Sequence, residues 1–143
     1  MEASFELFDH TADIGIRARA ATLPELATVM GGGLYAVIGE LLPAQGAAAE
    51  ARELKIELQH ADIAVLLRDY LDELLVLFDR DHRIVTVANV STFGEGRLVA
   101  VLETTLVDHQ RSVYQHEVKA ITYHELDIRQ IRGGFEAAVI VDI

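Results

Sequence analysis

The stretch FDHTADIGIRARA, residues 8–20, places two aspartates and a histidine directly before a strand-like pattern. In its second half Ile14, Ile16 and Ala18 alternate with glycine and arginine, which is the two-residue period of a half-buried β-strand. On that period Asp13 lies on the face opposite to Ile14 and Ile16. The pattern therefore predicts a strand that starts with an acid outside the core.

A second strand pattern ends the sequence, FEAAVIVDI, residues 135–143. Chain ends are usually polar and poorly ordered, so an apolar strand at this position is unusual. Asp142 falls on one face of the strand, and the opposite face carries Phe135, Ala137, Val139, Val141 and Ile143. If the strand is ordered to its last residue, the α-carboxylate of Ile143 is held beside Asp142.

Carboxylates that are held close together repel each other unless a positive charge joins them. Arg17 or Arg19, which follow Asp13 closely in the sequence, could supply that charge. A hard divalent cation could also supply it, because carboxylate and carbonyl oxygens suit Ca²⁺ and Mg²⁺. Solvated acids at strand ends are the simpler explanation, and spacing alone leaves all three open.

Two amphipathic helices are predicted between these strands. The first starts after Thr22, which with Glu25 forms a capping box. Its apolar face carries a residue at every fourth position: Leu26, Met30, Leu34 and Ile38. The second runs through residues 61–80 with Asp62 at its start, and its apolar stripe is Ile63, Leu66, Leu67, Tyr70, Leu71, Leu74 and Phe78.

The remaining sequence is rich in strand patterns, with turn signals at residues 94–96 and 133–134 and a predicted loop over Pro43–Ala51. Most connections are too short for parallel crossovers, so antiparallel pairing should dominate. The sequence thus predicts an α+β fold, with two main helices packed on a largely antiparallel or mixed β-sheet. The predicted strands are Phe5–Phe8, Asp13–Ala20, Glu53–Gln59, Ile84–Ser91, Arg97–Val107, Glu117–Thr122, Glu125–Ile131 and Phe135–Asp142.

Three consecutive glycines, Gly31–Gly33, interrupt the first predicted helix. A glycine inside a helix costs up to about 1 kcal/mol relative to alanine. A phosphate-binding loop would need a preceding strand and a following Gly-Lys-Ser/Thr, and the sequence has neither. A kink, or close packing against a sheet, is the better explanation.

The composition is that of a globular domain, with 51% hydrophobic and 24% charged residues among 143. We expect no membrane span and no signal peptide, and hence a cytoplasmic protein. The absence of cysteine excludes disulfides, thiolate metal sites and cysteine nucleophiles. The net charge of −11 argues against tight, direct binding of nucleic acid, because phosphate backbones are also negative.

The six histidines form no compact ligand pair such as HExxH, and no Gly-x-Ser-x-Gly motif indicates a hydrolase. His10 and His124 are of interest because of their neighbours in the sequence. A hydrogen-bonded or surface histidine is the simpler interpretation of each.

Four stretches, taken together, resemble the archease family. FDHTADIGIRA, residues 8–18, resembles its N-terminal signature, and EVKAITYHELDI, residues 117–128, resembles its second signature. AAVIVDI, residues 137–143, resembles its C-terminal ending, and the helical segment at residues 66–79 matches in type and position. The resemblance implies one archease-like domain over residues 1–143.

The resemblance also implies an accessory protein and not an enzyme. Archeases activate the GTP-dependent tRNA-splicing RNA ligase of the RtcB type, by promoting guanylylation of a ligase histidine and multiple turnover. The role implied for this chain is therefore in tRNA splicing or RNA repair, with that ligase as protein partner.

A divalent metal site is implied as well, for Ca²⁺, Mg²⁺ or Mn²⁺. Carried onto this sequence, its ligands are Asp13, Asp142 and Ile143, the last through a backbone or terminal oxygen. Four further residues fall inside the signatures and are candidates for contact with the ligase or its active site: Asp9, His10, Lys119 and His124.

Two other functions are kept as alternatives. One is a chaperone-like module that binds partner proteins and changes their solubility. The other, less favoured, is a metal-dependent phosphohydrolase that uses the same acids.

Overall fold

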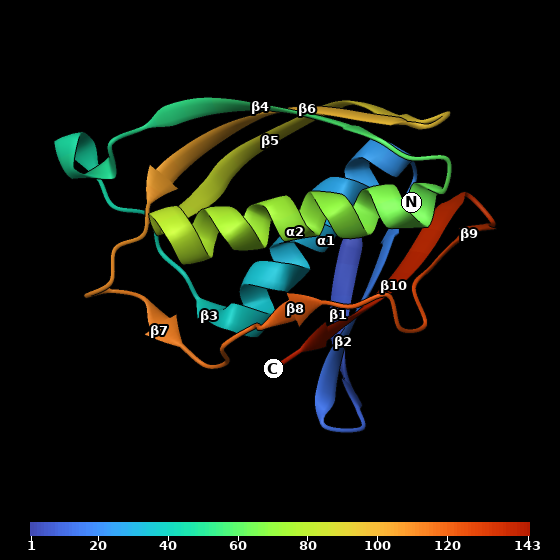
Figure 1. Ribbon diagram of the computed structural model, residues 1–143, viewed down its shortest axis with the longest axis horizontal. Helices are drawn as coiled ribbons and strands as arrows, with labels where there is room; N and C mark the ends of the chain where they lie inside the picture. Colours follow the sequence, from blue (N-terminus) through green and yellow to red (C-terminus); the bar gives the residue numbers. More distant parts are fainter.

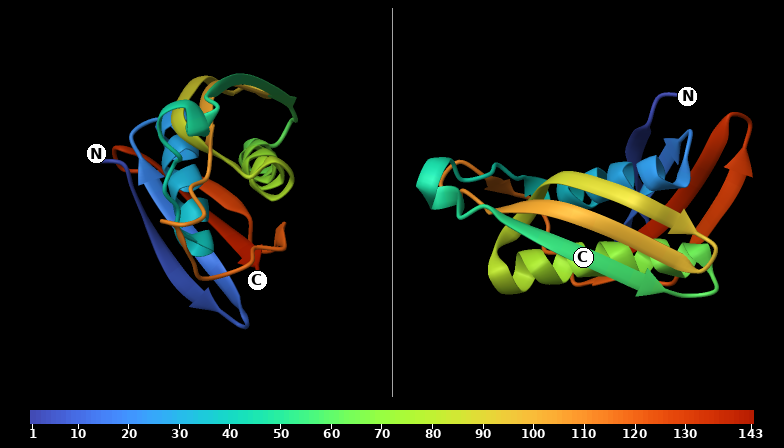
Figure 2. Two further views of the ribbon diagram at one scale, coloured as in Figure 1. Left: turned by 90° about the vertical axis from the view of Figure 1, so that its left-hand side faces the viewer. Right: turned by 90° about the horizontal axis from the view of Figure 1, so that it is seen from above.

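The computed structural model describes residues 1–143 and contains two larger antiparallel sheets with two helices between them (Figures 1 and 2). The helices are α1 (Leu23–Ile38) and α2 (Ile63–Asp81). The first sheet consists of β1 (Ser4–His10), β2 (Asp13–Ala20), β8 (Ala120–Ile121), β9 (Asp127–Ile131) and β10 (Gly134–Asp142). The second consists of β4 (Arg52–Gln59), β5 (Arg83–Gly94) and β6 (Arg97–Leu106). The predicted α+β class is confirmed.

Thr22 and Asp62 cap the two helices as predicted, but the second bond of the capping box, from the Thr22 N–H to the Glu25 carboxylate, is not formed. The Thr22 hydroxyl accepts a hydrogen bond from the backbone N–H of Glu25 at 3.2 Å. A carboxylate oxygen of Asp62 accepts one from the backbone N–H of Ala64 at 2.8 Å. Each side chain therefore satisfies one of the free N–H groups of a helix N-terminus.

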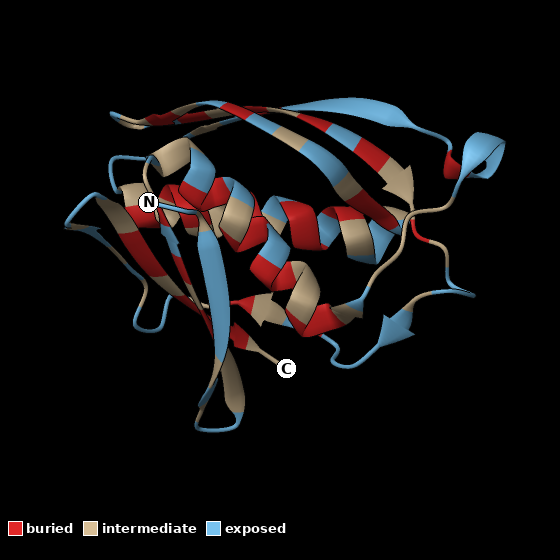
Figure 3. Ribbon diagram, turned by 180° about the vertical axis from the view of Figure 1, so that it is seen from behind, coloured by how far each residue is buried: buried red, intermediate tan, exposed pale blue.

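Strand β2 pairs with β1 on one side and with β10 on the other, both antiparallel. Ile16 is the register partner of Leu7 on β1 and of Val139 on β10. The β1–β2 hairpin extends beyond the rest of the sheet, and its exposed tip is plain in Figure 3. The N-terminal hairpin and the C-terminal strand thus lie side by side in one sheet.

Two predicted strands are shorter than expected. The strand predicted over Glu117–Thr122 is limited to Ala120–Ile121, and the one predicted over Glu125–Ile131 begins at Asp127. Both lie along the same edge of β10, β9 beside Gly134–Ala138 and β8 beside its last residues. Because they share one edge, neither can pair along its whole length.

Three short elements were not predicted. Strands β3 (Gly39–Glu40) and β7 (Val113–Tyr114) form a two-residue ladder, and a 3₁₀ helix covers Gly46–Ala49 inside the predicted loop Pro43–Ala51. Elements of two to four residues carry no measurable hydrophobic period, so the pattern of the sequence does not reveal them.

The core is one cluster of 26 buried residues, drawn from both helices and both larger sheets (Figure 3). Tyr35 connects α1 to the second sheet, because its hydroxyl accepts a hydrogen bond from the backbone N–H of Val85 at 2.9 Å. Burial raises the pKa of Tyr35 to about 12. No helix is both long and apolar enough to pass through a membrane.

The triple glycine lies within the unbroken helix α1, where it packs closely against its neighbours. A Cβ added at Gly33 would lie 2.5 Å from Cγ2 of Ile16 on β2, which is too close for two carbon atoms. At the exposed Gly32 the nearest atom, on Phe5, would be 3.6 Å away. Close packing therefore explains Gly33 and Gly31, whose added Cβ would lie 3.1 Å from Leu74, but not Gly32.

Glu136 joins three strands through two ion pairs. The buried carboxylate on β10 accepts hydrogen bonds from Arg19 on β2 at 2.6 Å and from Nε of Arg129 on β9 at 2.9 Å. Hydrogen bonds from Arg19 and then Arg129 hold the pKa of Glu136 below its ordinary value.

The glycine packing predicts opposite effects of two neighbouring substitutions. Gly33→Ala should lower the free energy of unfolding by roughly 1–3 kcal/mol, because the new methyl group overpacks the contact with Ile16. Gly32→Ala should raise it by up to about 1 kcal/mol, because alanine is the better helix former. Urea unfolding of both variants measures this, and a destabilised Gly32→Ala together with an unaffected Gly33→Ala would contradict it.

The ion pairs of Glu136 predict a pH-dependent stability. A lowered folded-state pKa stabilises the fold above the ordinary value of 4.5, and this stabilisation is lost as the pH falls through the folded-state pKa. Glu136→Gln should therefore lower the Tm at neutral pH, and the difference from the wild type should disappear in acid. The control is Glu6→Gln, which removes the exposed pair with Arg17 and should change the Tm little. An equal Tm difference at all pH values argues against this account.

Candidate functional site

The register between β2 and β10 brings the predicted metal ligands to one end of the first sheet. Val141 is the partner of Ile14, so the next step along both strands sets Asp142 beside Asp13. Both aspartates are half-buried, as is Ile143, which packs against the core. The C-terminus lies at this end of the sheet in Figure 1.

The donor set here suits a hard cation. Two half-buried carboxylates, from Asp13 and Asp142, come from adjacent strands, and Ile143 adds oxygen donors directly after the second one. Calcium, magnesium and manganese prefer oxygen ligands of this kind. The residues present therefore fit the metal class that the sequence implies.

The other predicted site residues lie around this edge. The backbone N–H of Lys119 donates to the carbonyl of Asp142 at 2.8 Å, and its side chain is exposed. Asp9 is exposed on β1, as the register partner of Ile14. His10 is the register partner of Asp13 and is half-buried.

His10 and His124 are brought together, although they belong to different signatures. Their ring centroids are 5.2 Å apart, in an edge-to-face arrangement. Glu125 lies between them, with one carboxylate oxygen 3.1 Å from Nε2 of His10 and the other 3.7 Å from Nε2 of His124. Glu125 was not singled out from the sequence, and its position directly after His124 was the only available signal.

Arg68 on α2 holds the segment that carries His124. Its Nε donates to the carbonyl of Ile121 at 3.0 Å, and its guanidinium lies over the ring of Tyr123, 4.6 Å from the centroid. A second bond, to Asp69 at 2.9 Å, orients the guanidinium. The connection between β8 and β9 is thereby anchored to the helix layer.

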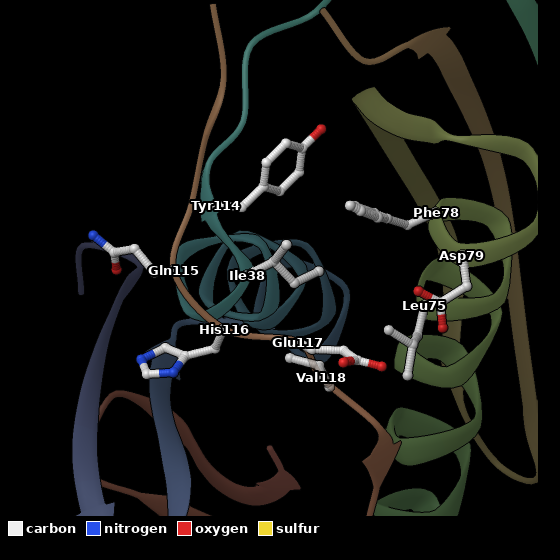
Figure 4. Close-up of a pocket in the computed structure, with 9 residues that line it drawn as sticks. All are labelled: Ile38, Leu75, Phe78, Asp79, Tyr114, Gln115, His116, Glu117 and Val118. Carbon is white, nitrogen blue, oxygen red and sulfur yellow. The ribbon is translucent and has the colours of Figure 1, made fainter. Parts of the chain in front are cut away.

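A separate pocket of about 280 Å³ lies between the ends of both helices and the segment 114–118 (Figure 4). Asp79 and Glu117 face each other across it. Burial, and then the charge of Glu117, raises the pKa of Asp79. The lining contains none of the predicted site residues: it is Ile38, Leu75, Phe78, Asp79, Tyr114, Gln115, His116, Glu117 and Val118.

We call the end of the first sheet that carries Asp13, Asp142 and Ile143 the acidic edge. The fold and this edge define a class of small α+β protein, and comparison with known proteins identifies the family. The model of the Archease protein family (MTH1598/TM1083) matches residues 5–143, so the chain belongs to the archease family. A protein archease from Thermococcus gammatolerans is 34% identical over 133 residues, 91% of each chain. One from Methanosarcina barkeri is 32% identical over 143 residues, covering 97% of this chain and 95% of the relative. The names of these relatives state no enzymatic activity.

Two solved structures share the fold. The solution structure of protein 1598 of Methanobacterium thermoautotrophicum is 26% identical and has a TM-score of 0.71, covering 97% of this chain and 98% of that one. The crystal structure of an archease from Thermotoga maritima, described as a possible chaperone, has a TM-score of 0.70. It is 15% identical and covers 95% of this chain and 94% of that one, so this likeness concerns the fold alone.

Proposed function

We propose that this chain is a cytoplasmic activator of a GTP-dependent tRNA-splicing RNA ligase, acting in tRNA splicing or RNA repair. Membership of the archease family supports this role. The observation that carries it furthest is the pairing of Ile14 with Val141, which brings the strand ends at Asp13 and Asp142 together. This pairing joins the first signature to the C-terminal ending and makes one acidic edge from both.

In this proposal the acidic edge holds a divalent cation, Ca²⁺, Mg²⁺ or Mn²⁺, through Asp13, Asp142 and an oxygen of Ile143. When bound, the cation supplies positive charge that helps to manage the charge of a nucleoside triphosphate during guanylylation. The chain's own residues position that charge, because Asp13 is paired with His10 on β1 and Asp142 with Ala120 on β8. The chemistry itself takes place on the ligase.

Charge favours a protein partner over direct contact with RNA. The net charge of −11 repels phosphate backbones but steers the chain toward a basic, RNA-binding surface. We propose that Asp9, His10, Lys119 and His124 contact the ligase, since all four lie on segments next to the acidic edge.

Two alternative functions predict different experimental results. A chaperone-like role, which follows the description of the Thermotoga maritima protein, needs protection of unrelated unfolding proteins, independent of Asp13. A phosphohydrolase needs turnover of simple phosphoesters with Mn²⁺ that is lost in Asp142→Ala. Both assays use the purified protein without a ligase.

The proposal predicts the effect of removing one carboxylate at a time. Asp13→Asn and Asp142→Asn should each weaken Ca²⁺ binding by roughly tenfold or more, because affinity follows the charge and number of oxygen ligands. Each should also abolish most of the stimulation of a cognate ligase under multiple-turnover conditions. Calorimetry with Ca²⁺ and a ligation assay with varied GTP and metal measure the two effects.

The matched control is Glu53→Gln, which removes one exposed carboxylate from β4 on the other sheet. It should leave both metal binding and ligase stimulation unchanged. A wild-type chain that does not stimulate its cognate ligase, or an Asp13→Asn variant that stimulates it fully, rules out the proposed mechanism.

A further inference from the structure

A second set of metal-ligating side chains lies beside the hairpin tip. His10 ends β1, and His124 and Glu125 lie in the connection between β8 and β9. One ligand atom from each of the three residues lies within 4.8 Å of the others, and no other group of three or more such residues does so in this chain. The three come from two segments that are far apart in the sequence.

The chemistry of this set differs from that of the acidic edge. Two imidazoles with one carboxylate are the ligands of Zn²⁺ and similar borderline cations, whereas Ca²⁺ and Mg²⁺ prefer oxygen alone. Three protein ligands also leave a fourth position of a tetrahedral ion free. We propose that His10, His124 and Glu125 form a site for a divalent transition-metal ion of the Zn²⁺ class.

The state of His10 supports the proposal. Its side chain is only 21% exposed, and while Nε2 faces Glu125, the other ring nitrogen, Nδ1, is buried without a hydrogen-bond partner. Nε2 is therefore the nitrogen placed to bind a metal ion together with Glu125. The half-buried ring is held in place, so little side-chain freedom is lost when the ion binds.

Two of the five non-glycine residues with positive φ lie in or beside the cluster. Ala12 in the hairpin tip has φ of 68° and Glu125 has φ of 51°, a left-handed conformation that side chains other than glycine seldom adopt. Such a conformation persists only where the surrounding structure enforces it. Here the anchoring of the β8–β9 connection by Arg68 holds Glu125 in place.

A metal ion at this position joins the first signature to the second. It ties the hairpin tip to the β8–β9 connection, two segments that the His10–Glu125 ion pair and the contact between the two histidine rings already join. The inference goes beyond the proposed function, because it gives His10 and His124 a metal-binding role and shares no ligand with the acidic edge. The two sites can therefore fail independently.

Zinc titration of the metal-free protein, in competition with a chromophoric chelator, tests the site. The wild type should bind one equivalent, and His124→Gln and Glu125→Gln should each weaken binding by about tenfold or more. Both side chains are exposed, so these variants should fold even where His10→Gln does not. Zinc should also raise the Tm of the wild type but not that of His124→Gln.

His109→Gln is the matched control. His109 belongs to the other close histidine pair, with His82 at 5.4 Å between ring centroids, but that pair is not part of any three-residue ligand group. The His109→Gln variant should keep the wild-type zinc affinity. The Asp142→Asn variant should bind zinc within about threefold of the wild-type affinity. The proposal is overturned if the wild type binds zinc no more tightly than His124→Gln, or if His109→Gln is weakened as much. Calcium binding that survives in His124→Gln separates this result from a failure of the acidic edge.

Discussion

The antiparallel ladder between β2 and β10 is the constraint on which the rest of the molecule depends. Ile16 and Val139, both without solvent exposure, are partners in its middle. A slip by one residue would turn the buried side chains of either strand to the opposite face, so the apolar pattern excludes that slip. That same register determines that Asp13 and Asp142 end their strands next to each other.

The helix layer depends on this ladder in turn. Gly33 lets α1 lie directly on Ile16, and Tyr35, two residues further along, bonds to the second sheet through Val85. The helix thus touches one sheet with its glycines and the other with a buried hydroxyl. Glycine lowers the stability of the helix, but it allows close packing between the helix and the sheet. Both sheets therefore share one core.

One end of the first sheet brings two candidate metal sites close together. Asp13 is the register partner of His10, so an oxygen-rich edge and an imidazole cluster begin on opposite strands of one hairpin. The β8–β9 connection completes the second group, and Arg68 fixes that connection to α2. An acidic chain that presents such an edge is suited to a basic partner and poorly suited to bare RNA.

The sequence by itself determined the long helices and strands, because their signals are local. Thr22 and Asp62 mark the helix starts, and residues 14–20 show the two-residue period of a strand. It also pointed to Asp13 and Asp142 as acids at two strand ends. Only the tertiary structure decided that β8 and β9 share one edge of β10, which shortened both strands and carried His124 and Glu125 to His10. No local sequence pattern predicts that His10 lies close to His124 and Glu125. Their proximity depends on which strands pair, and strand pairing depends on burial of the whole core.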